Sequence, residues 1–461
     1  MGGGVEMWKG VAFAVAVVGA LLMVSAGGAL SASRLRLDLV GGNGLMVGSQ
    51  TSDIDVDPTR DVAYLGSFVD LGVAVVDISD RAHPSVVGIL STDYVGADDR
   101  VSSSDSADVD LNGNLLAVAS QAFTEDAFAG VSLYDITDPF EPVFLGQVWT
   151  GGTHDVQIDP GWPARPYVYS ANFESDDSDH GFRVSIINAS DPTDPVILTD
   201  YESPEPQGED GLAFNSAHDL TLLVHPDTGR VLLYVAYWDS GLRIVDVTNP
   251  EDPEQIGALD YTPSVTSLGL IDTCCAHYAQ PTPSGDYVLL EDEVGIGLAG
   301  GVHILRADGC DGVNECALEE VGFWDPPIPS PQAMAVMAEI HAGVTTNGLF
   351  QRFFTRDVHN LDVQEDRFLA AVYSSGVYLV DMADKSNPRV IAFWTGAVNV
   401  KTACHGKNTL IPWGYQGNCY FQGREVWGAK FGDPVPGGGS DFYIYASDFW
   451  LGLLIFRTVS S

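Results

Sequence analysis

One phrase recurs along this chain, and its recurrence constrains the fold more than any other feature. Each copy has an apolar, β-branched run, an Asp or Asn at its end and a Pro a few residues later; the five clear copies are GVAVVDISDRAHP, GVSLYDITDPFEP, RVSIINASDPTDP, GLRIVDVTNPEDP and GVYLVDMADKSNP. Two weaker copies, GGVHILRADG and LGLLIFRTVS, carry Arg306 and Arg457 at the Asp position. The apolar run predicts a strand, and the Asp and Pro predict a turn before the next strand. The chain is therefore predicted to contain seven structural units.

The spacing of these units predicts a closed ring of sheets. The first four copies lie 53 to 58 residues apart, which is the length of a four-stranded blade of a β-propeller. The last unit ends after three strands, and residues 33–40 form an unassigned strand that can complete it and cover an open edge. We therefore expect an all-β fold, a seven-bladed β-propeller with the N-terminal strand closing the last blade. The alternatives, a linear solenoid or two sandwiches, would leave this strand and the shortened last unit unexplained.

Residues 27–461 are predicted to form this single propeller. The expected blades span residues 50–95, 104–150, 152–202, 214–262, 272–325, 355–396 and 422–461, the last completed by 33–40.

Residues 1–26 have the order of an export segment. Lys9 precedes an apolar run from Gly10 to Ala26, and small residues follow. The run is nearly long enough to span a bilayer, so an uncleaved N-terminal anchor is the alternative to a cleaved signal peptide. In both cases we expect a secreted or cell-surface protein that contacts a membrane only through an uncleaved N-terminal segment.

The repeats GLRIVDVTNPEDP, GVYLVDMADKSNP and GVAVVDISDRAHP closely resemble the LVIVD repeat of secreted and surface-attached bacterial and archaeal proteins. The resemblance extends over nearly all of the expected mature chain. It implies a β-propeller that serves as a secreted or surface binding scaffold. It transfers no catalytic residue, because that family is defined by its repeat and not by a reaction.

Charge and cysteine content narrow the partners and the compartment. The chain has 63 acidic and 21 basic residues, and its net charge of −42 argues against nucleic acid as a partner. Six cysteines fit an oxidising compartment. We expect Cys310 to pair with Cys316 across a short loop, and Cys404 with Cys419. The adjacent pair at 274 and 275 is then left without an assigned partner.

A column of histidines at the start of the innermost strand of several blades is the main candidate site. The residues in this column and directly after it are His154 with Asp155, His218 with Asp219, His277, and His359 with Asn360, while Asp53, Asp108 and Glu425 stand at the second position in other blades. Because the innermost strands line the channel, these residues should surround one of its mouths. Four imidazoles there can bind a transition metal, with the carboxylates orienting the rings. Alternatively, each histidine is a structural hydrogen-bonding post within its own blade.

Sulfur and another imidazole lead into the same region. Cys274, Cys275, Cys404 and His405 precede innermost strands, and thiolate with imidazole suits copper or zinc. Cysteines in disulfides cannot be ligands, and outside the cell disulfides are the expected state. Calcium is a further candidate cofactor at the acidic residues within 174–179 and 291–293, although such clusters are more often solvated charge. Residues 108–113 match the opening of a calcium loop, but we favour a hairpin turn there.

The function predicted from these observations is binding. We expect a scaffold that binds an extracellular protein, a glycan or a small ligand on the channel face, where long inserts can shape recognition. The alternative is a copper- or zinc-dependent oxidoreductase with a histidine-lined site at the channel mouth. Familiar hydrolase and nucleotide-binding motifs are lacking in the sequence, so an enzyme is the less favoured reading.

Overall fold

The computed structural model describes residues 35–42, 51–67, 72–90, 94–95, 101–102, 105–121, 128–172, 180–204, 215–261, 275–293, 300–327, 358–395, 410–411, 415–416, 426–449 and 451–460. The chain divides into a unit of residues 1–32, which lies outside these ranges, and a unit of residues 33–461. The export segment predicted at residues 1–26 is therefore not described. Within the described ranges, no helix is long and apolar enough to cross a bilayer.

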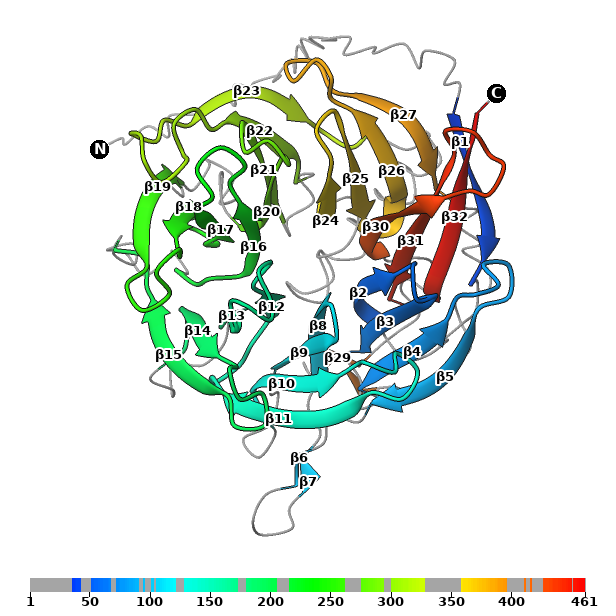
Figure 1. Ribbon diagram of the computed structural model, residues 1–461. Helices are drawn as coiled ribbons and strands as arrows, with labels where there is room; N and C mark the ends of the chain where they lie inside the picture. The colour runs from blue at the N-terminus through cyan, green and yellow to red at the C-terminus, as the bar shows by residue number, and fades with distance from the viewer. Residues whose placement is uncertain are drawn as a thin grey trace, which may run out of the picture. The chain divides into compact units, whose positions relative to one another are not determined.

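The second unit is a ring of seven four-stranded antiparallel blades (Figure 1). Blade 1 consists of β2 (Thr51–Asp57), β3 (Val62–Ser67), β4 (Val73–Asp77) and β5 (Ser85–Leu90). Blade 2 consists of β8 (Asp105–Asn112), β9 (Leu115–Gln121), β10 (Gly130–Asp135) and β11 (Val143–Trp149). Blade 3 consists of β12 (Asp155–Ile158), β13 (Tyr167–Ala171), β14 (Val184–Asn188) and β15 (Val196–Tyr201). Blade 4 consists of β16 (Asp219–Val224), β17 (Val231–Ala236), β18 (Gly241–Asp246) and β19 (Glu254–Asp260).

The remaining blades repeat the same order. Blade 5 consists of β20 (Ala276–Pro281), β21 (Tyr287–Asp292), β22 (Val302–Arg306) and β23 (Glu319–Trp324). Blade 6 consists of β24 (Val358–Val363), β25 (Arg367–Val372), β26 (Gly376–Asp381) and β27 (Arg389–Trp394), with the short 3-10 turn η2 (Tyr373–Ser375). Blade 7 consists of β30 (Val426–Pro434), β31 (Phe442–Asp448), β32 (Gly452–Ser460) and β1 (Leu35–Gly41). Two small hairpins pair β6 (Tyr94–Val95) with β7 (Val101–Ser102) and β28 (Leu410–Ile411) with β29 (Tyr415–Gln416).

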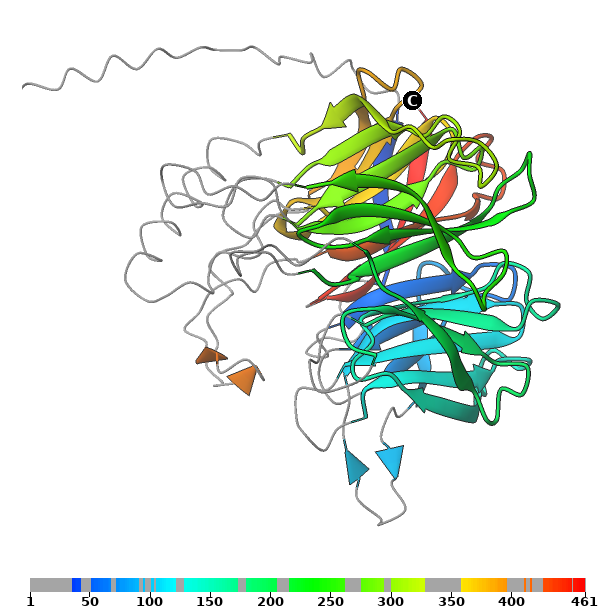
Figure 2. The ribbon, with the colours of Figure 1, turned by 90° about the vertical axis from the view of Figure 1, so that its left-hand side faces the viewer.

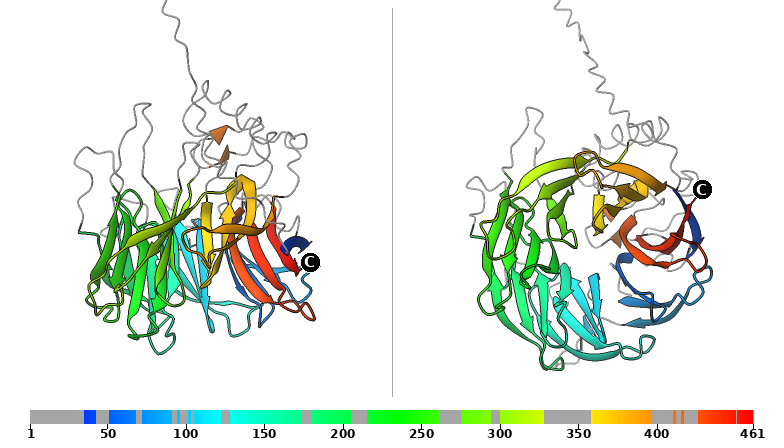
Figure 3. Two further views of the ribbon diagram at one scale, coloured as in Figure 1. Left: turned by 90° about the horizontal axis from the view of Figure 1, so that it is seen from above. Right: turned by 45° about the horizontal axis from the view of Figure 1, so that its top comes forward.

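The N-terminal strand closes the ring, as predicted. Strand β1 pairs antiparallel with β32, from Leu35 opposite Ser460 to Gly41 opposite Ile455. Figures 1 and 3 show dark-blue β1 lying along red β32. The first and last parts of the propeller thus share one sheet, so β32 does not present an open edge.

The apolar core confirms a circular arrangement. Seven buried clusters each combine side chains from two neighbouring blades, and one of them joins blade 7 to blade 1 through Ile54, Tyr445 and Ile455. A linear row of seven blades would have six such interfaces. The side view in Figure 2 shows the twisted sheets that pack face to face in this way. The fold is therefore a closed seven-bladed propeller.

The repeated Asp or Asn makes the turn that the sequence predicts. The side-chain Oδ1 atom of this residue accepts the backbone N–H two positions later, at 2.8 to 3.0 Å, in five blades: Asp77, Asp135, Asn188, Asp246 and Asp381. The turn fixes where the third strand of each blade ends. A hairpin, as favoured, follows β8, where Asn112 pairs with Leu115.

Candidate metal centre at the channel mouth

The four predicted histidines lie at the starts of four consecutive innermost strands. His154 and His218 directly precede β12 and β16, and His277 and His359 are the second residues of β20 and β24. These strands line the channel side of blades 3 to 6 (Figure 1). Because each blade presents the same strand end to the same mouth, the four imidazoles meet there.

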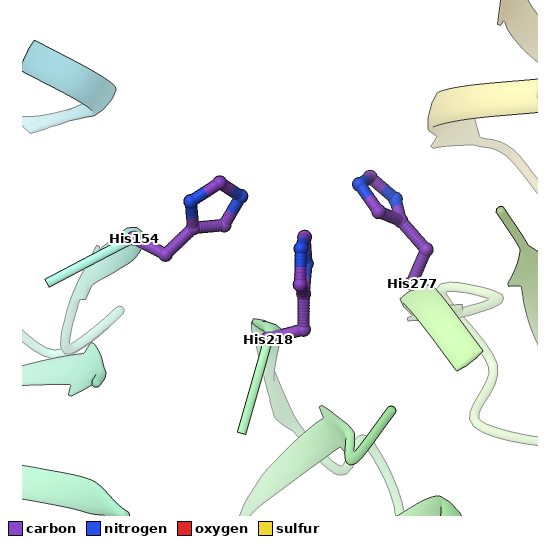
Figure 4. A group of neighbouring side chains, drawn as sticks. All are labelled: His154, His218 and His277. Atoms are coloured by element: carbon purple, nitrogen blue, oxygen red, sulfur yellow. The ribbon is translucent and has the colours of Figure 1, made fainter. Parts of the chain in front are cut away.

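The imidazoles form a continuous arc. Ring centroids lie 4.2 Å apart between His154 and His218, 4.3 Å between His218 and His277, and 4.4 Å between His277 and His359. Figure 4 shows the first three rings converging, and one ring nitrogen of each lies within 4.8 Å of the other two. His218 and His277 are only 3% and 1% exposed. This is a close, largely buried group of three nitrogen donors.

Fixed partners hold the rings in place. Nδ1 of His277 donates to Glu291, with 3.0 Å between Nδ1 and Oε2, and Nδ1 of His359 donates to the backbone carbonyl of Trp427 at 2.8 Å. The side-chain amide of Gln121 lies 2.7 Å from Nδ1 of His154. At His277 and His359, a donating Nδ1 leaves Nε2 as the unprotonated nitrogen that can bind a ligand, as in metal-binding histidines oriented by a second group.

Asp219 lies close to three of the imidazoles. Its carboxylate oxygens lie 3.2 Å from Nδ1 of His218, 3.7 Å from Nδ1 of His277 and 3.8 Å from Nε2 of His154. Burial raises the pKa of Asp219 well above its usual range, and the charges of Asp155 and Asp53 add to this effect. A cation at the mouth would offset this unfavourable concentration of buried carboxyl groups.

Burial also keeps the imidazoles neutral. It lowers the pKa of His154 to about 4 and the pKa values of His218, His277 and His359 well below the ordinary value, with the neighbouring imidazoles lowering these three further. Neutral imidazole is the form that binds a metal ion. The site therefore needs no proton release from histidine at neutral pH.

Aromatic rings cover the histidines on two sides. Trp238 stacks on His218 with 4.6 Å between ring centroids, while Tyr373 and Trp427 lie 4.9 Å and 4.0 Å from His359. Sequence reasoning missed all three of these aromatic residues. A signal was present, because Trp238 and Tyr373 occupy the same turn between the second and third strands of their blades, three residues before Gly241 and Gly376.

Four acids of the innermost strands hold neighbouring blades together. A carboxylate oxygen accepts a backbone N–H from the next blade in four places: Asp55 from Leu111, Asp110 from Ile158, Asp155 from Leu220, and Asp362 from Phe431. Asp155 was predicted as a metal-site residue, and its hydrogen bond shows a structural role. Asn360, another predicted site residue, donates from Nδ2 to Asp53 at 3.3 Å.

A small cavity adjoins the histidines inside the channel. Its volume is about 20 Å³, and one ordered water needs roughly 10–15 Å³. The cavity therefore has room for an ion or a water. The residues around the cavity are Asp53, His154, Asp155, Gln157, Asp219, Tyr278, His359, Asn360, Trp427 and Lys430.

Lys430 provides a positive charge in this acidic channel. Although burial opposes it, the charges of Asp53, Tyr278 and Asp55 raise the pKa of Lys430 well above its ordinary value, so the side chain stays charged. Strand β30 thereby contributes a cation close to acids of β2 and β24. Lys430 was not among the site residues predicted from the sequence.

The cysteines and the remaining candidates do not enlarge the described site. Cys310 and Cys316 form the predicted disulfide, with an S–S distance of 1.96 Å, and Cys316 packs against Gly257 of β19. Cys275 is also disulfide-bonded, so its sulfur is not a thiolate ligand. The other candidates lie outside the described residues: Asp108 by its side chain, and Cys274, Cys404, His405, Cys419, Glu425 and the acidic segment 174–179 entirely.

Comparison with known proteins agrees with the repeats. The LVIVD-repeat profile matches residues 59–92, which contain β3 to β5, and residues 232–260, which contain most of β17 and all of β18 and β19. Both matches cover the outer three strands of a blade. The protein is a seven-bladed β-propeller that carries LVIVD repeats at these two segments.

Solved structures resemble this LVIVD-repeat propeller in fold alone. The β-propeller domain of Cps50 (Swd1) from Myceliophteria thermophila is 12% identical, with 92% of this chain and 98% of that chain covered and a TM-score of 0.53. A functionally unknown protein from Desulfotomaculum acetoxidans is 12% identical, with 76% and 87% covered and a TM-score of 0.49. No curated protein matches the sequence.

Proposed function

We propose that this LVIVD-repeat propeller is a secreted or surface-attached binding protein that holds a transition-metal ion, zinc or copper, through His154, His218 and His277. One observation carries the proposal: three buried or half-buried imidazoles bring their nitrogens within 4.8 Å of one another at the channel mouth. The export segment expected at residues 1–26 supports the extracytoplasmic location.

The spacing of the nitrogens suits a metal ion after a small adjustment. Zinc–imidazole bonds of about 2.0–2.1 Å place two nitrogens of a tetrahedral site roughly 3.4 Å apart. Rotations of the rings about their terminal side-chain torsions can supply the contraction from 4.8 Å. The hydrogen bond from His277 to Glu291 restricts such movement at one ring, because Glu291 is fully buried. The most exposed of the three rings, His154, is therefore expected to move most.

The donor set selects the class of metal. Neutral imidazoles suit zinc, copper, nickel and iron, whereas calcium and magnesium prefer oxygen ligands. The disulfide at Cys275 removes one sulfur from consideration, so the site is proposed to bind through nitrogen. A protein, a glycan or a larger organic ligand would have to bind outside the small cavity, on the loops around the mouth.

A metal-dependent oxidoreductase is the second candidate. Three imidazoles leave a coordination position open, as in catalytic zinc sites. Glu293 borders this region: its carboxylate lies 3.7 Å from Nε2 of His277 and accepts a hydrogen bond from the Tyr373 hydroxyl. Redox turnover would require copper, because zinc has no redox chemistry. Oxygen consumption with an added reductant by the copper-loaded protein, and not by the zinc-loaded protein, would favour this candidate.

Metal analysis of protein purified without an affinity tag tests the proposal. We expect chelator-stripped protein to take up close to one equivalent of zinc or copper, measured by elemental analysis after gel filtration. His218→Ala should lose this uptake. His83→Ala is the matched control, because the side chain of His83 is 83% exposed and far from the mouth in sequence and fold. Equal uptake by wild type and His218→Ala, or no uptake by wild type, would refute the proposal.

A further inference from the structure

The residue at the turn between β17 and β18 has an unusual backbone. Trp238 has a φ of +40°, a conformation that side chains with a Cβ atom rarely adopt. Such strain persists only where the surrounding structure holds it, and it is common at functional sites. The turn is tied down by the carbonyl of Trp238, which accepts from the backbone N–H groups of Gly241 and Ala276, each at 3.1 Å.

This strained turn contacts two of the proposed metal ligands. The indole of Trp238 stacks on His218 with 4.6 Å between centroids and an angle of 22° between ring planes, and it lies 6.3 Å from His277. The hydrogen bond to Ala276 fixes the residue directly before His277. Trp238 of blade 4 thus constrains His218 in its own blade. It also constrains the strand of blade 5 that carries His277.

Other strained residues flank the same two histidines. The described part of the chain has four non-glycine residues with positive φ, and three of them lie here: Phe182, Trp238 and Cys275. The carbonyl of Phe182 accepts the backbone N–H of Ala217, which precedes His218. Cys275 lies two residues before His277. The strain is therefore concentrated where His218 and His277 are held.

We propose that Trp238 is a positioning residue that fixes His218 and His277 in the orientation needed for metal binding and shields them from water. The inference rests on the proposed metal-binding function for its purpose, but the positioning of the rings can be tested without metal. The stacked geometry carries it: the indole is only half-buried, while the imidazoles behind it are 3% and 1% exposed. Removing the indole would open one face of His218 to solvent.

Three substitutions separate the ring from the backbone strain. Trp238→Phe keeps an aromatic ring, Trp238→Ala removes it and leaves a Cβ at positive φ, and Trp238→Gly removes both the ring and the strain. We expect Trp238→Ala and Trp238→Gly to weaken zinc affinity about 10- to 100-fold, as loss of a ligand-orienting partner does. Trp238→Phe should retain most of the affinity. Metal-free Trp238→Gly should melt at a higher temperature than Trp238→Ala, because glycine tolerates the turn.

A metal-independent measurement makes the inference falsifiable by itself. Diethyl pyrocarbonate modifies accessible neutral imidazoles, and mass spectrometry gives the rate at each histidine. In metal-free protein we expect His218 to react severalfold faster in Trp238→Ala and Trp238→Gly than in wild type and Trp238→Phe. His83 provides the internal control in every sample, and Trp149→Ala, which removes a 52% exposed indole on β11, is the matched variant.

The outcomes distinguish this inference from the function on which it rests. If wild type binds no zinc, the proposed metal function fails, and the modification rates still decide the role of Trp238. If wild type binds zinc while Trp238→Ala shows wild-type affinity and wild-type reactivity at His218, metal binding stands and the positioning role is refuted.

Discussion

The substitution Leu37→Ala should measure how much the N-terminal strand β1 contributes to the free energy of unfolding of the closed ring. Leu37 of β1 is 5% exposed, lies opposite Thr458 of β32 and packs in the cluster shared by blades 6 and 7. Leu-to-Ala changes in a core cost about 2–5 kcal/mol. Because β1 is an outer strand that can relax towards the remaining side chains, we expect Leu37→Ala to cost about 2–3 kcal/mol. A loss of that size should lower the melting temperature by roughly 2–3 °C in a chain of this length.

The neighbouring residue provides the control. The side chain of Arg36 is 69% exposed and pairs only with Asp38 on the surface, so Arg36→Ala should leave the melting temperature unchanged. Thermal unfolding followed by circular dichroism, with urea titration as a second measure, compares both variants with wild type. If Leu37→Ala unfolds at the wild-type temperature and urea concentration, β1 does not complete blade 7 and the closure argument is wrong.

Three further predictions follow from buried polar contacts. Burial lowers the pKa of His303, but hydrogen bonds and charge from Asp292 and Glu320 outweigh burial and raise this pKa to about 9. Protonated His303 should therefore stabilise the fold fully below pH ~6.5. About 2 kcal/mol of the free energy of unfolding should be lost as the pH rises through 9. His303→Asn should abolish this slope in the free energy of unfolding, and an unchanged slope would contradict the assignment. Asp110→Ala should cost about 1–3 kcal/mol in urea unfolding because it leaves the buried N–H of Ile158 without an acceptor, whereas Asp110→Asn should cost less; equal costs would argue against the inter-blade hydrogen bond. Glu291→Gln should weaken zinc binding about 10- to 100-fold in a chelator competition titration, and unchanged affinity would show that Glu291 does not orient its histidine.

The sequence predicts the ring because the same Asp or Asn turn recurs in five of the seven blades. An Asp such as Asp135 ends the third strand by accepting a backbone N–H two residues later, and that role requires only neighbouring residues. Closure by the N-terminal strand was also predictable, because a blade with three strands leaves an edge that another strand must cover. The repeated turn residues and the number of strands in each unit were therefore sufficient to predict the fold.

The histidine column was predictable for the same reason, but the residues around it were not. Repetition at one strand position places His154, His218, His277 and His359 at one mouth, since equivalent positions of a propeller converge. Glu291, the partner of His277, lies near the end of β21, and no repeated spacing marks it. Trp238 and Tyr373 do share a turn position three residues before a glycine, but which histidine each ring contacts depends on how distant strands pair.

The role of the acids shows a further limit of sequence reasoning. Asp155 and Asp219 occupy equivalent positions, and the sequence suggests the same orienting role for both. In the structure Asp155 accepts the backbone N–H of Leu220, while Asp219 lies beneath three imidazoles.

X-ray absorption spectroscopy of the zinc-loaded, untagged protein tests the central claim most directly. The account predicts a first shell that contains at least three nitrogen atoms at about 2.0–2.1 Å, with the multiple-scattering pattern of imidazole. A shell made of oxygen alone, or one with a single imidazole, would place the ion elsewhere and contradict a centre built from His154, His218 and His277.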